Sequence, residues 1–220
     1  MIRKEPLDGG RFVYVDDTCT FGADAVLLAR FAPVRDHDRV CDLGCGSGII
    51  PLIWFADGIS PTVDAVDLSL PAVQLAQRTV EENALSTHIT VHHQDWTALT
   101  LPTDAYDLVT CNPPYFAAGS GKTSQHPLRR LARHETSTTL SDVCAAAYRL
   151  LKVGGHCCLC HRPERLPDLL EQLRRAHLEP KRLQVVYAHA TAAPFLILCD
   201  AVKGGAPSLS VLPPHFLESR

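Results

Sequence analysis

Long hydrophobic runs are absent from this 220-residue sequence, and no stretch approaches the ~18 consecutive apolar residues that a membrane span requires. The first residues, Met1 to Pro6, also lack the apolar core of a secretory signal. Aromatic residues make up only 6% of the chain, yet hydrophobic residues as a class make up 46%. Such a chain can bury a large core, which excludes a disordered or low-complexity protein. We therefore expect a single domain in the cytoplasm, with no membrane partner.

Cysteine is plentiful, but its pattern does not indicate a disulfide framework. The nine cysteines are an odd number, and a chain of this length does not need disulfides to hold a core. Four of them lie inside apolar segments, where cysteine behaves as a small hydrophobic residue, and we expect reduced core thiols at Cys41, Cys111, Cys144 and Cys199. The segment 156–161 suggests zinc, but a strand is expected there, which would point alternate side chains to opposite faces. Its spacing is also not that of a zinc knuckle, so no metal is predicted.

Acidic residues are absent between Asp107 and Glu135. Four basic residues lie in that interval: Lys122, Arg129, Arg130 and Arg133. Residues 1–107 carry 7 Lys and Arg against 16 Asp and Glu, whereas residues 108–220 carry 14 against 8. This asymmetry favours a second half that faces a polyanion, although charge alone predicts an ordinary solvated surface equally well.

Short apolar runs alternate with helical periodicity along the chain. Strands are predicted at 39–43, 62–67, 88–93, 106–111 and 156–160, with a closing antiparallel pair at 182–188 and 194–202. Helices are predicted at 21–29, 49–56, 69–83, 140–151 and 167–177. We expect Gly154 and Gly155 to end the helix 140–151, whose core face would include Ala145, Ala146, Tyr148 and Leu151. The alternation predicts an α/β protein with a mostly parallel, doubly wound sheet. In such sheets ligands bind at the carboxyl ends of the strands, so the residues that follow each strand are the candidate site.

A glycine-rich turn follows the first of these strands, with the sequence Asp42-Leu43-Gly44-Cys45-Gly46-Ser47-Gly48. Glycines at alternating positions permit a tight turn and let a ligand lie against bare main chain. Such a turn alone fits a dinucleotide, a phosphate or simply close strand–helix packing. Its spacing is not the Gly-x-Gly-x-x-Gly of a pyrophosphate site, and Asp42 would repel a phosphate but suit a cationic ligand.

Acids also follow the next two strands. Asp67 lies 21 residues beyond Gly46, a distance at which an acid accepts hydrogen bonds from a ribose diol. A helix-capping role fits Asp67 equally well. Asp95 could accept from an adenine amino group and Trp96 could cover the ring, whereas the alternative is a loop cap beside a partly buried core aromatic.

The strand 106–111 is followed by Asn112-Pro113-Pro114-Tyr115-Phe116. Two consecutive prolines fix the backbone and forbid a helix, so this segment leaves the strand in one stiff geometry. Asn112 offers a side-chain acceptor, Pro113 a main-chain acceptor, and Tyr115 a flat aromatic face. A structural turn could use the same residues, but two acceptors beside a stacking surface are what an exocyclic amine on a planar group requires.

Taken in order, residues 42–48, Asp67, Asp95 and Asn112–Tyr115 resemble the successive motifs of class I S-adenosylmethionine-dependent methyltransferases that act on planar amines. The resemblance covers nearly the whole chain. One bacterial branch is similar at residues 11–29, 132–135, 201–205 and 212–214: the tRNA (adenine-N6)-methyltransferases that modify the adenine beside the anticodon of a valine tRNA.

This resemblance implies a Rossmann-like fold with a mostly parallel seven-stranded sheet, an antiparallel closing strand and helices on both faces. It also implies an N-terminal segment, residues 1–38, that packs over the donor site, followed by the methyltransferase domain, residues 39–220. The implied cofactor is S-adenosyl-L-methionine and the implied substrate is a tRNA. No metal is implied.

The resemblance carries roles for individual residues. The implied donor site comprises Asp42, Gly44, Cys45, Gly46, Gly48, Asp67, Leu68, Asp95, Trp96 and Asn112. The implied catalytic residues are Asn112, Pro113, Pro114 and Tyr115. The implied contacts to substrate RNA are Phe116, Lys122, Arg129, Arg130 and Arg133.

Two other functions are compatible with the same residues. Protein glutamine N5-methyltransferases of the release-factor type share the Asn-Pro-Pro-Tyr motif, because a glutamine amide is also a planar amine. They usually carry a separate N-terminal helical domain, whereas here 38 residues precede the strand at 39–43, which favours adenine as the target. The second is a module that binds the donor without catalysis, and the intact Asn112 and Tyr115 favour an enzyme.

Overall fold

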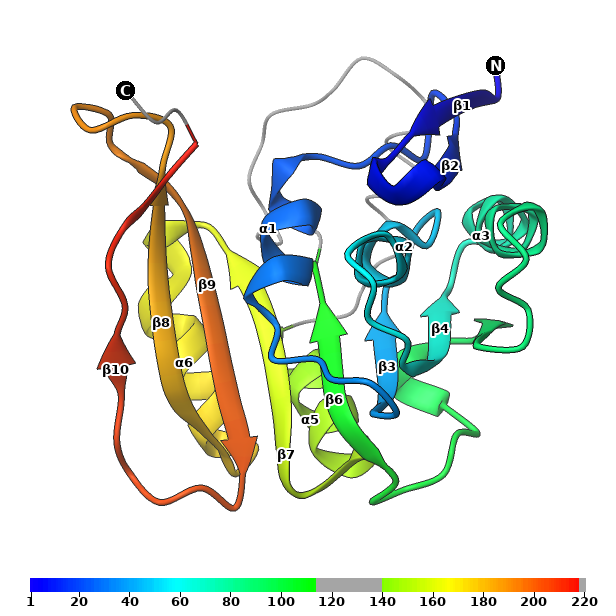
Figure 1. Cartoon of the computed structure of the whole chain (residues 1–220). Coiled ribbons are helices and arrows are strands. Elements are labelled where there is room, and N and C mark those ends of the chain that lie inside the picture. Colours follow the sequence, from blue (N-terminus) through cyan, green and yellow to red (C-terminus); the bar gives the residue numbers. More distant parts are fainter. Residues whose placement is uncertain (114–139, 218–220) are drawn as a thin grey trace.

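The computed structural model describes residues 1–113 and 140–217 (Figure 1). Seven of the predicted site residues lie outside the described residues: Pro114, Tyr115, Phe116, Lys122, Arg129, Arg130 and Arg133. Within the two described ranges, none of the helices has the length and apolar character needed to cross a membrane.

A central sheet occupies the middle of the molecule (Figure 1). Its seven main strands are β3 (Arg39–Leu43), β4 (Thr62–Asp67), β5 (Ile89–His93), β6 (Tyr106–Cys111), β7 (Leu151–His161), β8 (Leu178–Tyr187) and β9 (Pro194–Lys203). They lie in the order β8-β9-β7-β6-β3-β4-β5, and β9 runs antiparallel to both of its neighbours. The predicted mostly parallel sheet with one antiparallel closing strand is confirmed.

Two further strands, β10 (Ser210–Val211) and β11 (His215–Phe216), were not predicted. Both pair in parallel with β8, so the C-terminal tail runs along the outer edge of the sheet. The backbone N–H of Leu212 donates to the carbonyl of Leu183 at 2.8 Å, and Leu217 donates to Tyr187 at 3.1 Å.

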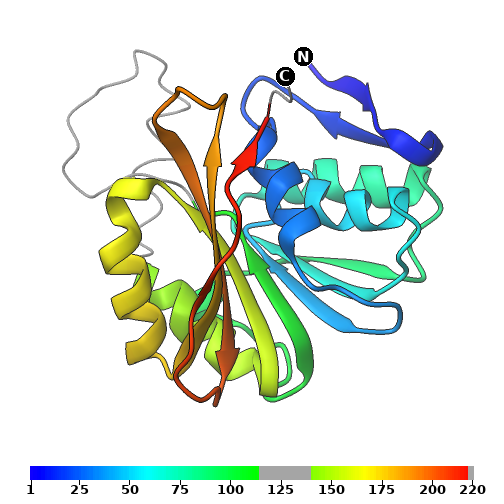
Figure 2. The same ribbon diagram turned by 60° about the vertical axis from the view of Figure 1, so that its left-hand side comes forward.

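Helices cover both faces of the sheet, and each layer has its own hydrophobic core (Figure 2). One layer holds α1 (Ala23–Phe31), α2 (Ile49–Ala56) and α3 (Leu70–Glu82), and the other holds α5 (Leu140–Leu150) and α6 (Leu166–Arg175). The described residues also form three short 3-10 helices: η1 (Asp8–Gly10), η2 (Trp96–Ala98) and η3 (Pro163–Arg165). The first core includes Trp54, which is 1% exposed and whose Nε1 donates to the carbonyl of Ala29 at 2.9 Å.

The expected roles of Gly154 and Gly155 are wrong. Helix α5 ends at Leu150 and β7 begins directly at Leu151, so both glycines lie inside the strand. Residues 152–155 oppose the single Asp107 of β6, and the left-handed φ of +84° at Gly154 permits this bulge. The glycines therefore bend a strand instead of ending a helix.

The predicted core face of α5 is partly wrong as well. Ala146 is buried as expected, but Ala145 and Tyr148 are exposed. The buried face is Val143, Cys144, Ala146, Ala147 and Leu150, because the i, i+4, i+7 row that begins at Val143 meets the sheet. The Tyr148 ring instead covers Lys203, whose Nζ lies 4.2 Å from the ring centroid.

A two-stranded hairpin of β1 (Arg3–Pro6) and β2 (Phe12–Val15) precedes α1 and packs on α3 (Figure 1). Polar side chains of the helix complete the backbone hydrogen bonds of β2. The Tyr14 N–H donates to Thr79 Oγ1 at 3.0 Å, and Phe12 donates to Asn83 Oδ1 at 3.2 Å. Asn83 Nδ2 returns a bond to the carbonyl of Phe12 at 2.8 Å. The hairpin is thus bonded to the helix that follows β4.

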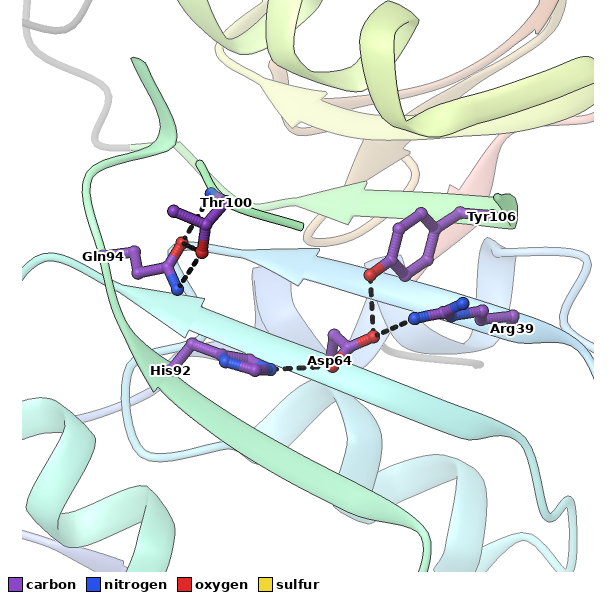
Figure 3. A network of polar contacts seen from close by, with 6 residues as sticks. All are labelled: Arg39, Asp64, His92, Gln94, Thr100 and Tyr106. Carbon is purple, nitrogen blue, oxygen red and sulfur yellow. Dashed lines mark hydrogen bonds and ion pairs between the residues drawn. The ribbon is translucent and has the colours of Figure 1, made fainter. Parts of the chain in front are cut away.

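A polar network lies on the α5 face of the sheet (Figure 3). Asp64 of β4 accepts hydrogen bonds from Tyr106 Oη at 2.7 Å and from Arg39 at 3.3 Å, and it pairs with His92 Nε2 at 2.7 Å. Burial raises the pKa of Asp64, but the hydrogen bonds from His92 and Tyr106 outweigh it and hold the pKa below its ordinary value. These bonds join the four adjacent strands β6, β3, β4 and β5.

Candidate functional site

The predicted site residues follow neighbouring strands at one edge of the sheet, at the upper ends of β3 and β6 in Figure 1. Strand β3 lies between β4 and β6, and the pairing of Leu43 with Cys111 fixes their relative position. Gly44 and Asn112, the residues that come next on each strand, therefore emerge side by side. Candidate site residues at these strand ends were expected from the sequence.

Asp67 and the end of β4 hold the glycine-rich turn in place. The Gly46 N–H donates to Asp67 Oδ2 at 2.9 Å, and the Ser69 N–H donates to Asp67 Oδ1 at 2.8 Å. The N–H groups of Gly44 and Cys45 both donate to the carbonyl of Val66, at 2.8 and 3.0 Å. Burial raises the pKa of Asp67, although the bonds from Ser69 and Gly46 oppose the rise.

The turn presents its main chain while its side chains are occupied elsewhere. Cys45 is buried, and its thiol contacts the Gly46 carbonyl at 3.7 Å, so only its backbone is available to a ligand. Gly48 has a φ of +83°, which favours glycine, whereas a Cβ there would lie at an ordinary contact distance of 3.7 Å from Ala76 Cβ. Leu68, just beyond the turn's partner Asp67, is 41% exposed.

Trp96 packs directly on the turn. A Cβ at Gly44 would lie 2.9 Å from the Trp96 ring, and Gly44 has a φ of +71°. Asp95 caps η2, because its Oδ1 accepts from the N–H and the hydroxyl of Thr97, both at 2.8 Å. Asp95 therefore caps the loop, as the alternative interpretation held. The Trp96 ring also packs against the hydrophobic core beneath α5 and α6.

Substituting Gly44 with alanine is expected to lower the free energy of unfolding by more than the backbone strain alone, which costs about 1–3 kcal/mol. The added methyl group meets Trp96 as well as an unfavourable φ. Gly58 is a matched control, because its φ is +84° but nothing lies within 4 Å of an added Cβ. Urea unfolding of Gly44→Ala and Gly58→Ala measures the difference. Equal losses in the free energy of unfolding would show that the Trp96 ring moves aside at no energetic cost.

Asp42 is buried in the strand that leads into the turn. Its side chain is 0% exposed, and Oδ1 accepts a hydrogen bond from Thr110 Oγ1 at 2.7 Å. Its other oxygen, Oδ2, has no hydrogen-bond partner among the described residues. Burial raises the pKa of Asp42 to about 7. The nearby charge of Asp67 adds to this rise, whereas the hydrogen bond from Thr110 opposes it. A buried carboxyl oxygen without a partner is energetically unfavourable, and more so when it is ionised.

Asn112 contacts Cys160, a cysteine that no sequence pattern singled out. The Cys160 thiol donates to Asn112 Oδ1 at 3.1 Å, and Pro113 beyond it is buried. Cys160 lies on β7, one residue past the pairing of Cys111 with Leu159, so the register between β6 and β7 creates the contact. No local sequence signal reports that register.

A second cysteine, Cys19, lies against the turn from the N-terminal segment. Its Sγ is 3.6 Å from the position of a Cβ on Gly46, and burial raises the pKa of its thiol to about 12. Asp16 holds this loop, because Asp16 Oδ1 accepts from the Cys19 N–H at 2.8 Å. The loop after β2 therefore reaches the glycine-rich turn.

The segment 156–161 is a strand, as predicted. Cys157 belongs to the core under α5 and α6, while Cys158 and Cys160 belong to the core on the opposite face. The four cysteines expected as core thiols, Cys41, Cys111, Cys144 and Cys199, are free and buried. Across residues 1–113 and 140–217, no cluster of three or more His, Cys, Asp or Glu side chains could hold a metal ion.

A family model described as methyltransferase small domain matches residues 13–173. A tRNA1(Val) (adenine(37)-N6)-methyltransferase of Aeromonas salmonicida is 38% identical over 149 residues, which cover 65% of this chain and 60% of that protein. A relative with the same name from Musicola paradisiaca is 33% identical over 174 residues, covering 77% and 69%.

Among solved structures, a protein described as a predicted O-methyltransferase from Agrobacterium tumefaciens matches with a TM-score of 0.71. The identity is 20%, and the match covers 88% of this chain and 87% of that one, which supports the fold. The match to the Aeromonas protein spans less than two thirds of that relative. The family model covers well over half of the sequence, and the chain therefore belongs to the methyltransferase small domain family.

Proposed function

We propose that this protein is an S-adenosyl-L-methionine-dependent methyltransferase that methylates N6 of an adenine next to the anticodon of a tRNA. Family membership and the names of its relatives support this activity. The observation that carries it is the pairing of Leu43 with Cys111, which sets the glycine-rich turn beside Asn112 and Pro113. A place for a nucleoside donor thus adjoins acceptors for a planar amine.

The turn and its neighbours fit the donor. The bare main chain of Gly44 and Gly46 would lie along it, and each oxygen of Asp67 keeps a lone pair for a ribose hydroxyl. The unpartnered Oδ2 of Asp42 would face the donor's cationic end. The adenine would lie near Leu68, Asp95 and Trp96, with Cys45 and Gly48 shaping the turn. The donor supplies an activated methyl group on a sulfonium.

The chain's own task is to present the target nitrogen. An exocyclic adenine amine is a weak nucleophile, because its lone pair is delocalised into the ring. Asn112 Oδ1 and the Pro113 carbonyl would each accept one N–H and thereby favour a pyramidal nitrogen whose lone pair faces the donor. Such positioning, with aligned dipoles, supplies most of the rate in a transfer that needs no strong base. Pro114 would keep the segment stiff, and Tyr115 and Phe116 would stack on the base for about 1–3 kcal/mol.

Residues 1–38 would cover the donor in this scheme, ahead of the methyltransferase domain at residues 39–220. Two contacts support that role. The loop at Cys19 reaches Gly46, and β2 is hydrogen-bonded to α3, which follows the donor-binding Asp67. The proposal also keeps the protein in the cytoplasm, where its tRNA substrate is found.

The decisive experiment incubates the protein with labelled donor and total tRNA, then identifies the labelled nucleoside by mass spectrometry. N6-methyladenosine is the expected product. A parallel reaction with purified release factors tests the glutamine alternative. Label in the release factors but not in tRNA would replace the proposed substrate, and no transfer to either would leave a donor-binding module.

Removing two positive charges from the acid-free interval is expected to weaken the salt dependence of tRNA binding. Arg129→Ala combined with Arg130→Ala should make the slope of log affinity against log salt shallower by about 1.5, since each phosphate contact contributes about 0.7–0.9. Arg174→Ala with Arg175→Ala is a matched control, because both arginines are exposed on α6. An identical slope in the first double variant would exclude those residues as phosphate contacts.

A further inference from the structure

We propose that the aromatic rings of Tyr187 and Phe216 form a stacking platform for an unpaired base of the substrate RNA. This inference rests on the proposed function, because it assigns a second contact to the RNA whose adenine is methylated. The two ring centroids lie 5.6 Å apart with an interplanar angle of 35°, and Phe216 is 38% exposed. The target adenine would be held beside Asn112, so the platform would receive another base of the same RNA.

The platform stands at the same edge of the sheet as the candidate site. Because β9 is antiparallel to both β7 and β8, strand β8 runs in the same direction as β6. The pairings across β7 and β9 place Cys111, at the end of β6, level with Leu183 of β8. Strand β8 continues from there to Tyr187, about 13 Å farther at about 3.3 Å per residue. The hairpin of β8 and β9 therefore rises beyond the ends of β3 and β6 (Figure 1).

The platform also lies close enough to the site for one RNA loop to reach both. Strands β9 and β7 separate β8 from β6, so three strand spacings lie between them, about 14 Å in all. The hairpin thus forms a wall beside Asn112, and its aromatic rings lie on the outer part of that wall. A loop that inserts its target adenine at Asn112 would extend neighbouring bases toward Phe216.

Hydrogen bonds of the C-terminal tail hold Phe216 beside Tyr187. Strand β11 pairs with the end of β8, and this pairing sets Phe216 opposite Tyr187. The Leu217 N–H donates to the Tyr187 carbonyl at 3.1 Å, and Gln184 Nε2 donates to the Pro213 carbonyl at 3.0 Å. The rings are therefore positioned before an RNA binds, which lowers the conformational cost of stacking.

The charge around the platform suits a polyanion. Residues 180–217 contain a single acidic residue, Asp200. Asp200 is 1% exposed and is paired with Arg182 and His156, so it presents no carboxylate to a phosphate. Aromatic side chains stack on unpaired bases of any identity, and the bases of RNA loops are the ones that proteins can reach in this way. An anticodon loop supplies such bases.

The binding test uses the full chain, S-adenosyl-L-homocysteine to prevent turnover, and a transcript of the tRNA1(Val) anticodon stem–loop. Phe216→Ala should weaken RNA binding about 5- to 20-fold, because the half-exposed ring offers one face to a base. It should raise KM for tRNA with little change in kcat or in the Kd for the donor. Phe216→Trp should retain the wild-type affinity, whereas Phe216→Leu should not, since leucine is apolar but cannot stack.

Tyr148→Ala is the matched control. Tyr148 is also 38% exposed, but it lies against Lys203 at the end of β9, at the opposite end of the sheet from the candidate site. This variant should bind the RNA as the wild type does. Full retention of affinity in Phe216→Ala or Phe216→Leu, or an equal loss in Tyr148→Ala, would overturn the inference.

A fluorescence test reports stacking directly and does not depend on methylation. A fluorescent adenine analogue replaces each loop base other than the target in turn, and its emission falls when it stacks on an aromatic ring. At one loop position the wild-type protein should quench this emission more strongly than Phe216→Ala does. Equal quenching by the two proteins at every position would overturn the inference.

Failure of the proposed function would give a different result. A wild-type protein that neither binds nor methylates tRNA would overturn the proposed function itself. Normal methylation with unchanged RNA affinity in Phe216→Ala would overturn the platform alone. A change in oligomeric state in Phe216→Ala, measured by light scattering and without a change in RNA affinity, would replace the RNA at this surface with a second copy of the chain.

Discussion

Asn112→Ala is expected to slow methyl transfer to tRNA by about 10²–10³-fold, the loss typical of removing one preorganised polar group from an active site. The donor affinity should change little, because the turn at Gly44 to Gly48, Asp42 and Asp67 remains intact. The physical reason is that Asn112 acts on the target amine, whose lone pair it exposes in the transition state. Single-turnover rates and donor titrations measure the two effects separately.

Asn112→Asp is the informative companion variant. A carboxylate accepts an N–H as the amide oxygen does, so this variant should retain more activity than Asn112→Ala. It can also still accept the bond from Cys160. Comparable losses of turnover and donor affinity in Asn112→Ala would contradict the assigned role and would place Asn112 in the donor site alone.

Asp42→Asn is expected to stabilise the folded protein above pH 7 and to lower its affinity for the methyl donor. Burial raises the pKa of Asp42 to about 7, whereas an aspartate in the unfolded chain has its ordinary pKa of 3.8. The folded state therefore holds the proton more tightly, and the contribution of Asp42 to stability is complete below pH 4 and lost as pH rises toward 7. Removing the charge should restore on the order of 2–4 kcal/mol at pH 8 and almost nothing at pH 4.

The loss of donor binding follows from the same burial. The anionic form of Asp42 would lie near the donor's cationic end, and an interaction of a charged group at hydrogen-bonding range, direct or through water, is worth about 1.5–3 kcal/mol. Asp42→Asn should therefore bind the donor about 10- to 100-fold more weakly at pH 8. Stability and binding would change in opposite directions in one variant.

Urea unfolding at pH 4 and pH 8 measures the stability effect, with Asp64→Asn as the control. The pKa of Asp64 is lowered in the folded state, so its contribution is present above the unfolded pKa and is lost as pH falls below it. Asp64→Asn should thus destabilise the protein at both pH values. A loss of stability at pH 8 in Asp42→Asn would show that Asp42 is a paired anion in the folded protein.

The elements whose ends are marked by local chemistry were predictable. The strands 39–43, 62–67 and 106–111 have the predicted bounds, because each is an apolar run flanked by polar or turn-forming residues. Elements defined by their partners were not. The bulge at Gly154 and Gly155 exists because β7 must pair with β6, and two glycines after a helix are locally indistinguishable from a helix stop.

The candidate site likewise contains residues that could be predicted from the sequence and contacts that could not. The glycine-rich turn and Asn112 could be selected from the sequence, since each immediately follows a strand and carries a distinctive residue pattern. The contacts of Cys160 with Asn112 and of Cys19 with the turn could not, because they depend on strand register and on where the hairpin docks. The unpartnered Oδ2 of Asp42 likewise becomes visible only when burial and neighbours are known.

The C-terminal tail along β8 has a consequence for the behaviour of the protein at high concentration. An uncovered outer strand offers a row of backbone donors and acceptors that can recruit a strand from another molecule. Here β10 and β11 pair with the backbone groups of β8. Pro213 and Pro214, which lie between these two strands, have no backbone N–H that could bond to a strand from another molecule. The tail thus protects this edge of the sheet from edge-to-edge aggregation, and its strands are too short to form a new edge that would itself need protection.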